Sequence, residues 1–171
     1  MKLSEEAQIL ALDVRHSRIG YALFSGPKRL LDWGANTVPS QCSNRAEWIR
    51  RRMAQLLRHG SPACIVTKPH RLAKLPRNTN GTSILETIRS VATEQGIPIY
   101  VLGRDEIESA FCIFRARTKE EIACAIVGIF PELLVRLPPK RKTWQPEAHG
   151  MIVFDATAAG IAYWQRQLPR K

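Results

Sequence analysis

Two aspartates stand where a carboxylate is costly. Asp13 comes directly after four apolar residues, 9–12. Asp155 falls on the face of a predicted helix whose other members are apolar or small: Met151, Ile152, Ala158, Ala159 and Ala162. Burying an unpaired carboxylate costs several kcal/mol, so each acid needs a cation, strong hydrogen-bond donors or a proton. If the two acids converge, a hard divalent ion with oxygen ligands, Mg2+ or Mn2+, would relieve their repulsion.

Local pairing is the alternative for each acid. Asp13 could bond the backbone of the turn at 15–18, or pair with Arg15 or Arg18, and Asp155 could cap its helix or pair locally. The two acids together, in a basic protein with the order of elements given next, favour the metal site.

Hydrophobic patterning places both acids in an α/β chain. Short apolar runs bounded by turn residues predict an antiparallel meander of three strands, at 8–14, 19–24 and 29–37. Two further strands are expected at 63–67 and 97–102, and amphipathic helices at 44–59, 83–96, 118–130 and 150–167. Ser83 to Glu86 and Thr118 to Glu121 have the spacing of capping boxes. The expected order is β-β-β-α-β-α-β-α-α-α, a mixed five-stranded sheet flanked by helices in a single domain, 1–171.

Two stretches between these elements do not fit a regular structure. Residues 70–81 are polar and basic and contain proline, which predicts a loop. The stretch 131–149 holds four prolines and cannot be one element.

The charge is strongly basic and unevenly placed. The chain has 26 Lys and Arg against 15 Asp and Glu, a net charge of +11. Between 33 and 85 there are nine bases and one acid. Such a positive field attracts polyanions, of which nucleic acid is the commonest, although ordinary surface charge is the plainer explanation. The candidate nucleic-acid contacts are Arg15, Arg18, Arg50, Arg51, Lys68, Arg71, Lys74, Arg77, Lys140, Arg141, Lys142 and Trp144, the last by stacking on a base unless it fills the core.

Other classes of protein are disfavoured by the same sequence. The longest apolar run, 122–130, is nine residues, which is too short to span a bilayer. The N-terminal run 7–12 is too short for a signal peptide, and no segment indicates a membrane partner. The four cysteines have no C-x-x-C spacing, so we expect reduced thiols in a cytoplasmic protein and no zinc site.

Two segments resemble a known family. Residues 9–22, ILALDVRHSRIGYA, resemble the first strand and hairpin of RuvC-like Holliday-junction resolvases and their YqgF-type relatives in the RNase H-like superfamily. Residues 154–162, FDATAAGIA, resemble the acidic start of their last helix. Because the order of the elements between these two segments also fits the family, the resemblance covers nearly the whole chain. It implies an RNase H-like fold. It also implies magnesium-dependent phosphodiester hydrolysis by a cluster of carboxylates holding two ions.

The resemblance assigns catalytic and metal-binding roles to particular residues. Asp13 matches the acid of the first strand, and Asp155 matches the first acid of the last helix. Glu106 is the preferred third ligand, with Asp105 close behind it. Glu147 or His149 could also reach inward from just before the last helix. For Asp105, Glu106 and Glu108 the alternative is an exposed acidic helix start, which the helix dipole favours.

Two departures put catalysis in doubt. The family's fourth-strand acid falls near Thr67, beside Lys68, and its second last-helix acid falls on Ala158. A lysine ammonium near the metal position would compete with cations.

Two hypotheses follow. The first is a nucleic-acid-binding RuvC-like endonuclease that acts on branched or structured DNA or RNA with Mg2+ or Mn2+. For symmetric cleavage of two strands, the resemblance implies a homodimer. The second is a catalytically degenerate RNase H-like module that binds nucleic acid or a protein partner without cleavage. A structural role without nucleic acid is a weaker third option.

Overall fold

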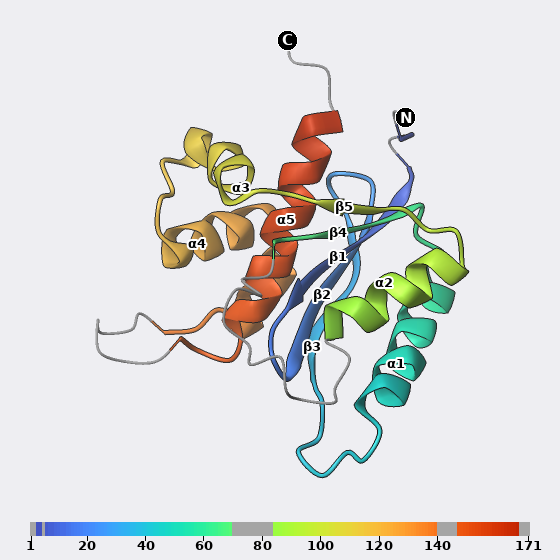
Figure 1. Ribbon diagram of the computed structural model, residues 1–171. Coiled ribbons are helices and arrows are strands. Elements are labelled where there is room, and N and C mark those ends of the chain that lie inside the picture. Colours follow the sequence, from blue (N-terminus) through green and yellow to red (C-terminus); the bar gives the residue numbers. More distant parts are fainter. Residues whose placement is uncertain (1–2, 5, 70–83, 140–146, 168–171) are drawn as a thin grey trace.

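The predicted mixed sheet is confirmed in a computed structural model that describes residues 3–4, 6–69, 84–139 and 147–167 (Figure 1). Its strand order is β3-β2-β1-β4-β5. The first three strands form an antiparallel meander: β1 is Gln8–Val14, β2 is Arg18–Ser25 and β3 is Leu30–Thr37. Two further strands run parallel to β1 on its other side: β4 is Cys64–Thr67 and β5 is Ile99–Val101.

Helices cover both faces of the sheet (Figure 1). One face carries α1, Arg45–Gly60, and α2, Ile84–Glu94. The other carries α5, Met151–Gln167, with α3, Arg104–Ala110, and α4, Lys119–Ile129, packed against it. Two short 3-10 helices flank α4: η2 is Cys112–Phe114 and η3 is Pro131–Arg136. The chain order therefore matches the predicted one.

Strand β1 is buried on both faces and divides the core into two layers. Ile9 and Ala11 point into the core under α5, whereas Leu10 and Leu12 point into the core under α1 and α2. This alternation follows from the two-residue period of a strand, and burial on both sides explains why the run is continuously apolar.

Helix α5 approaches the sheet very closely. A Cβ atom added at Gly20 in β2 would overlap the backbone carbonyl of Ile152, and one added at Gly160 would overlap the ring of Phe24. Gly20 is also the register partner of Asp13 in β1. The first turn of α5 is thereby held against the end of the β1–β2 hairpin, three residues before Asp155.

Several local predictions can be compared with the structure. The capping box at Thr118 and Glu121 is present at the start of α4. In the Pro-rich stretch 131–149, a short 3-10 helix begins at Pro131. The loop at 70–81 and the Ser83 cap lie outside the described residues. The four cysteines are free thiols, and no helix in the described part of the chain is long and apolar enough to cross a membrane.

Candidate functional site

The candidate site lies where the carboxyl ends of β1 and β4 meet the first turns of α5. The parallel register pairs Leu12 of β1 with Thr67 of β4. The next residues along the two strands are Asp13 and Lys68, which therefore lie side by side at the same edge of the sheet. Asp155 comes to this edge because α5 packs against the hairpin at Gly20.

The ammonium of Lys68 lies between the two aspartates. Its Nζ is 3.2 Å from Oδ1 of Asp13 and 3.0 Å from Oδ1 of Asp155. Both carboxylates thus contact the same nitrogen, and the predicted convergence of the two acids is seen in the structure. A lysine occupies the position between them where the sequence had suggested a metal ion.

The guanidinium of Arg15 engages the remaining oxygens of the two aspartates. Its Nε donates to Oδ2 of Asp13 at 3.0 Å, and its Nη2 donates to Oδ2 of Asp155 at 2.7 Å. Each of the four aspartate oxygens therefore contacts a cationic nitrogen. The local pairing of Asp13 with Arg15, weighed as an alternative from the sequence, is present.

A third acid and a third base complete the arrangement. Glu147 accepts from Nη2 of Arg15 at 2.8 Å, and its Oε2 lies 3.0 Å from Nζ of Lys119, the first residue of α4. The same Nζ is 3.1 Å from Oδ2 of Asp155. We call these six residues the ion-pair cluster: Asp13, Arg15, Lys68, Lys119, Glu147 and Asp155.

Burial and the neighbouring charges shift the pKa values of Asp155 and Lys119 in opposite directions, and the charges have the larger effect. The side chains of Asp13 and Asp155 are 10% and 12% exposed. Burial would raise the pKa of Asp155, but the positive charges of Lys68 and Lys119 hold that pKa below its ordinary value. Burial would likewise lower the pKa of Lys119, but Asp155 and Glu147 raise it above the usual range. Asp155 is therefore ionised and Lys119 protonated at neutral pH.

Comparisons with known proteins support the fold. No family model and no curated protein sequence matches the chain. RuvC of Thermus thermophilus, solved in complex with a Holliday junction, superposes with a TM-score of 0.66 over 94% of this chain and 95% of its own, at 19% identity. This chain has the RuvC fold.

Two other resolvases share the RuvC fold with this chain. The yeast mitochondrial Holliday junction resolvase Ydc2 gives a TM-score of 0.58 at 11% identity, covering 96% of this chain and 81% of its own. The fowlpox virus resolvase with Holliday junction DNA gives 0.52 at 12% identity, covering 95% and 99%. At these identities the likeness establishes the fold alone, and it confirms the RuvC-like, RNase H-like prediction. The resemblance to YqgF-type relatives stays a prediction.

The residues at this edge of the RuvC fold do not fit a divalent metal ion. All four aspartate oxygens are already engaged by Lys68 or Arg15 or Lys119. The three acids of the cluster are balanced by three bases, so no net negative charge is left to attract a cation. Within the described ranges, no group of three or more His, Cys, Asp or Glu side chains could hold a metal ion. The site that the sequence predicted for Mg2+ or Mn2+ is built around a lysine.

Glu106, the predicted third ligand, lies at the other end of α5. Its carboxylate accepts from the backbone N–H of Gly103 at 2.8 Å and pairs with Arg166 at 3.3 Å. Arg166 is eleven residues beyond Asp155 on α5, which is about 16 Å along the helix axis. Glu106 therefore does not join the aspartates. With Asp105 it forms an acidic first turn of α3, as the alternative interpretation expected.

The structure describes five of the predicted nucleic-acid contacts, at two places. Arg15 and Lys68 belong to the ion-pair cluster, and Arg18 contacts the ring nitrogen Nδ1 of His149. Arg50 and Arg51 on α1 pair with Glu94 and Glu47. The remaining candidates lie outside the described residues: Arg71, Lys74, Arg77, Lys140, Arg141, Lys142 and Trp144.

Lys119 is the one member of the cluster that the sequence did not suggest. Arg15, Glu147 and Lys68 had each been considered near the aspartates. The Thr118 capping box predicts where α4 begins, and so fixes Lys119 at its first position. It does not tell which other element that end of the helix contacts, so a pairing with Asp155 across 36 positions could not be derived.

Proposed function

We propose that this chain is a RuvC-fold protein that binds branched or structured nucleic acid and does not cleave it by a metal-dependent reaction. The observation that carries the proposal is the position of the Lys68 ammonium, within 3.2 Å of both aspartates. A tethered cation compensates the buried acids permanently, so they do not need an ion from solution. This geometry supports the hypothesis of a catalytically degenerate RNase H-like module better than that of an endonuclease.

Nucleic acid as the partner is supported by charge. The chain carries a net charge of +11. A group of uncompensated carboxylates would repel phosphate, whereas the balanced ion-pair cluster does not. Beside it, Arg18 contacts His149, and Arg45 donates to the backbone carbonyl of His16 at 2.5 Å. Neither arginine has a carboxylate partner among the described residues, so both can neutralise phosphates.

The solved proteins that share the fold point to branched DNA as the first substrate to try. Thermus RuvC and the fowlpox resolvase were both solved with Holliday junctions. A labelled four-way junction titrated at two salt concentrations tests the binding. We expect affinity to fall steeply with salt, because each neutralised phosphate releases counterions. Absent or salt-insensitive binding would refute a phosphate-contacting interface.

A variant pair locates that interface. Arg18→Ala with Arg45→Ala should weaken junction binding and lower the salt slope by roughly 2, one for each lost phosphate contact. The matched control is Arg104→Ala with Arg166→Ala, two exposed arginines that pair with glutamates elsewhere on the molecule. Equal effects from the two pairs would show that binding does not use the hairpin edge.

Cleavage is tested separately from binding. The wild-type protein and Asp13→Asn are incubated with junction DNA in Mg2+ and in Mn2+. We expect no metal-dependent products from either protein. Products that form with wild type and vanish with Asp13→Asn would establish the endonuclease instead, even if binding behaves as proposed.

A further inference from the structure

A small pocket lies between α1 and the edge strand β3. Its volume is about 230 Å3, and it is lined by Asp32, Arg52, Gln55, Leu56 and His59. Asp32 comes from β3, and the other four recur at intervals of three and four positions along α1, so they share one face of that helix. Helices α1 and α5 cover opposite faces of the sheet (Figure 1), so the pocket is separate from the ion-pair cluster.

Arg52 lines the pocket without a carboxylate partner among the described residues. Its Nη1 donates to Oε1 of Gln55 at 3.1 Å, and its Nη2 donates to the hydroxyl oxygen of Tyr21 at 3.3 Å. Its Cζ lies 5.4 Å from the centroid of the Tyr21 ring, a cation–π contact that helps to fix the guanidinium. Its Nε is buried and has no hydrogen-bond partner. Because a guanidinium carries more N–H groups than these contacts use, Arg52 can still bind an acceptor.

Asp32 lines the same pocket without a basic partner. Its Oδ1 accepts from the backbone N–H of Trp33 at 2.8 Å, and it forms no ion pair within the ranges that the structure describes. Burial raises the pKa of the Tyr21 hydroxyl, and the charge of Asp32 raises it further, whereas the charge of Arg52 lowers it. A neutral hydroxyl therefore lies near both charges. A Cβ atom added at Gly34 would lie 3.0 Å from that hydroxyl oxygen, so the glycine of β3 leaves Tyr21 the space it occupies.

Two opposite charges that do not pair with each other limit the chemistry of a ligand. Asp32 repels an anion and Arg52 repels a cation, so a fitting ligand presents acceptors to Arg52 and donors to Asp32. Guanine has both on neighbouring edges: its N7 and O6 accept, whereas its N1–H and N2 amino group donate. Arginine bonded to O6 and N7 is the commonest specific contact with a base. The two oxygens of a carboxylate match the two neighbouring donors.

The walls and the volume of the pocket suit a single ring system. Pockets for drug-sized ligands have volumes of roughly 300–1,000 Å3, so this smaller pocket takes a smaller molecule. Leu56 is buried and supplies an apolar wall, and His59 supplies a flat ring. Flat side chains of this kind stack on unpaired bases.

We propose that this pocket binds one guanine base. Arg52 donates to its O6 and N7, Asp32 accepts from its N1–H and N2 amino group, and the ring of His59 stacks on it. The base belongs either to a free guanine nucleotide or to an unpaired guanine of bound nucleic acid. Only in the second case does the inference rest on the proposed function.

Isothermal titration calorimetry with nucleoside monophosphates tests the free nucleotide. Guanosine, inosine, adenosine and cytidine monophosphates carry the same phosphate, so its attraction to a chain of net charge +11 is common to them all. The inosine nucleotide differs from the guanosine nucleotide only in lacking the N2 amino group. It should bind roughly tenfold or more weakly, because a hydrogen bond to a charged group is lost, and the other two should bind no better. Displacement of guanosine monophosphate by glycine would assign the pocket to a zwitterion and refute the proposal.

Asp32→Asn tests the contact with the amino edge of the base. The substitution replaces one acceptor oxygen by an amide donor. The variant should therefore bind xanthosine monophosphate, which has a carbonyl in place of the N2 amino group, more tightly than guanosine monophosphate. Misfolding would lose both ligands and could not produce this reversal. A variant that still prefers guanosine monophosphate would overturn the proposal.

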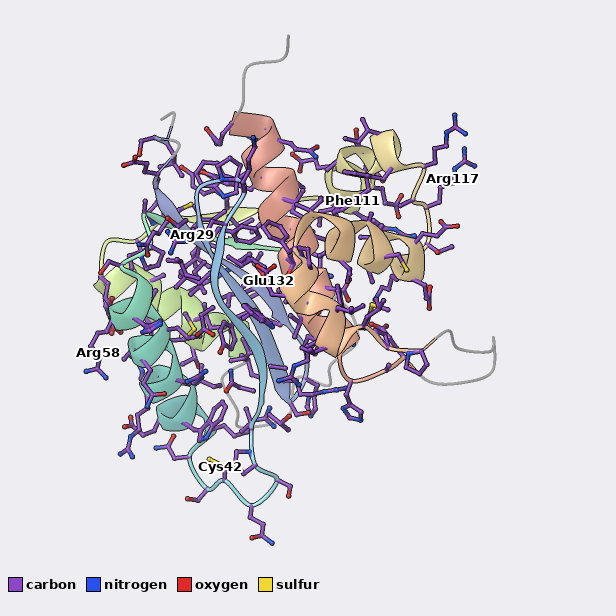
Figure 2. All side chains as sticks on the ribbon, turned by 180° about the vertical axis from the view of Figure 1, so that it is seen from behind. Arg29, Cys42, Arg58, Phe111, Arg117 and Glu132 are labelled. Atoms are coloured by element: carbon purple, nitrogen blue, oxygen red, sulfur yellow. The ribbon has the colours of Figure 1, made fainter. Side chains whose placement is uncertain are left out.

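Arg52→Lys tests the other edge. It keeps the charge but loses the paired donors, so guanosine monophosphate should bind roughly tenfold or more weakly. The matched control is Arg58→Ala, on the side of α1 that faces away from the sheet (Figure 2). It should leave the order of the nucleotides unchanged. Equal losses of guanine preference from the two variants would contradict a contact with Arg52.

A four-way junction with one unpaired guanine at its centre tests the base of bound nucleic acid. It should bind roughly tenfold or more tightly than the same junction with an unpaired adenine, and Asp32→Asn should abolish the difference. The fully paired junction should bind wild type and Asp32→Asn equally. If no junction binds, the proposed function fails and the nucleotide titration still decides this inference. A guanine preference in the junction assay alone assigns the base to nucleic acid, and its absence from both assays refutes the pocket.

Discussion

At the scale of single residues, Lys68 decides what the site can do. Two nearly buried carboxylates close together repel each other, and something positive must lie between them. A metal ion and an ammonium both satisfy this requirement, but only the metal can activate water for phosphodiester hydrolysis. The side chain of Lys68 is 23% exposed and reaches the aspartates from the residue directly after β4. The residue at position 68 thus determines whether this edge of the sheet can bind a metal ion or is held by ion pairs.

The first prediction concerns the stability that Lys68 provides. Lys68→Ala should lower the free energy of unfolding by roughly 3 kcal/mol, because it leaves Asp13 and Asp155 facing each other with less compensation. The matched control is Arg51→Ala, which removes an exposed pair with Glu47 and should cost no more than about 0.5 kcal/mol. Urea unfolding measures both. Equal losses would mean that the cluster behaves like a surface ion pair.

The second prediction concerns divalent ions. Mg2+ and Mn2+ should leave the unfolding midpoint of the wild-type protein unchanged, since its carboxylates are occupied. Lys68→Glu adds an acid and removes the competing ammonium, so this variant should be stabilised by the metal. At an ion concentration ten times the Kd, the gain is about 1.4 kcal/mol. A wild-type protein that responds as strongly as the variant would show that Lys68 does not exclude the ion.

At the scale of elements, the cluster joins four segments that are distant in the chain. Asp13 and Arg15 come from β1 and the hairpin after it, Lys68 follows β4, and Lys119 begins α4. Glu147 lies just before α5, and Asp155 lies in it. The ends of these elements, rather than their middles, meet at the site. A substitution that disorders one of these ends should therefore also weaken the ion pairs that the other elements make in the cluster.

The third prediction uses the cap of α4. Thr118 accepts from the backbone N–H of Glu121, and Thr118→Ala should cost about 1 kcal/mol. Asn44→Ala, at the corresponding cap of α1, should cost a similar amount. Only the Thr118 variant should change the effect of a second substitution, Lys119→Ala, with a coupling of about 0.5 kcal/mol or more in a double-mutant cycle. If Asn44→Ala couples equally, the α4 cap does not position Lys119.

The elements could be predicted from the sequence much better than the contacts between their ends. Turn residues and two-residue alternation were enough for the β1–β2–β3 meander, and apolar spacing was enough for α1, α4 and α5. The convergence of Asp13 and Asp155 also followed, because a buried acid demands a partner. Glu106 was misplaced because a position just after β5 suggested the site edge. Helix α3, which holds Glu106, instead packs toward the far end of α5. Hydrophobic periodicity does not show where along one helix another helix packs.

At the scale of the whole molecule, the excess of positive charge lies outside the cluster. The six cluster residues sum to zero, so the net charge of +11 is carried by the rest of the chain. In the proposed function, the cluster therefore stabilises the fold, while the surplus positive charge attracts nucleic acid. The two roles respond to different variables: surplus surface charge is screened by salt, whereas buried pairs respond mainly to pH.

The last prediction separates these roles by pH. In the folded protein the pKa of Asp155 lies below its ordinary 3.8, so its contribution is present above that pH and is lost as pH falls through the folded pKa. The pKa of Lys119 lies above its ordinary 10.5, so its contribution is present below that pH and is lost as pH rises through the folded pKa. The contributions of Asp155 and Lys119 should therefore be constant between about pH 5 and 10. Asp155→Asn should be less stable than wild type by roughly 3 kcal/mol at pH 7.

That difference should narrow as pH falls below about 3.8, because the protonated wild-type acid then resembles the amide. Glu94→Gln is the matched control. Arg50 and Ser90 also hold the pKa of Glu94 below its ordinary value, but its side chain is much more exposed than that of Asp155, so its difference from wild type should be smaller throughout. Unfolding midpoints in urea across this range measure both. A difference between Asp155→Asn and wild type that stays constant down to pH 2 would mean that Asp155 contributes through its shape rather than its charge. The tethered cations would then not be what holds this end of the RuvC fold together.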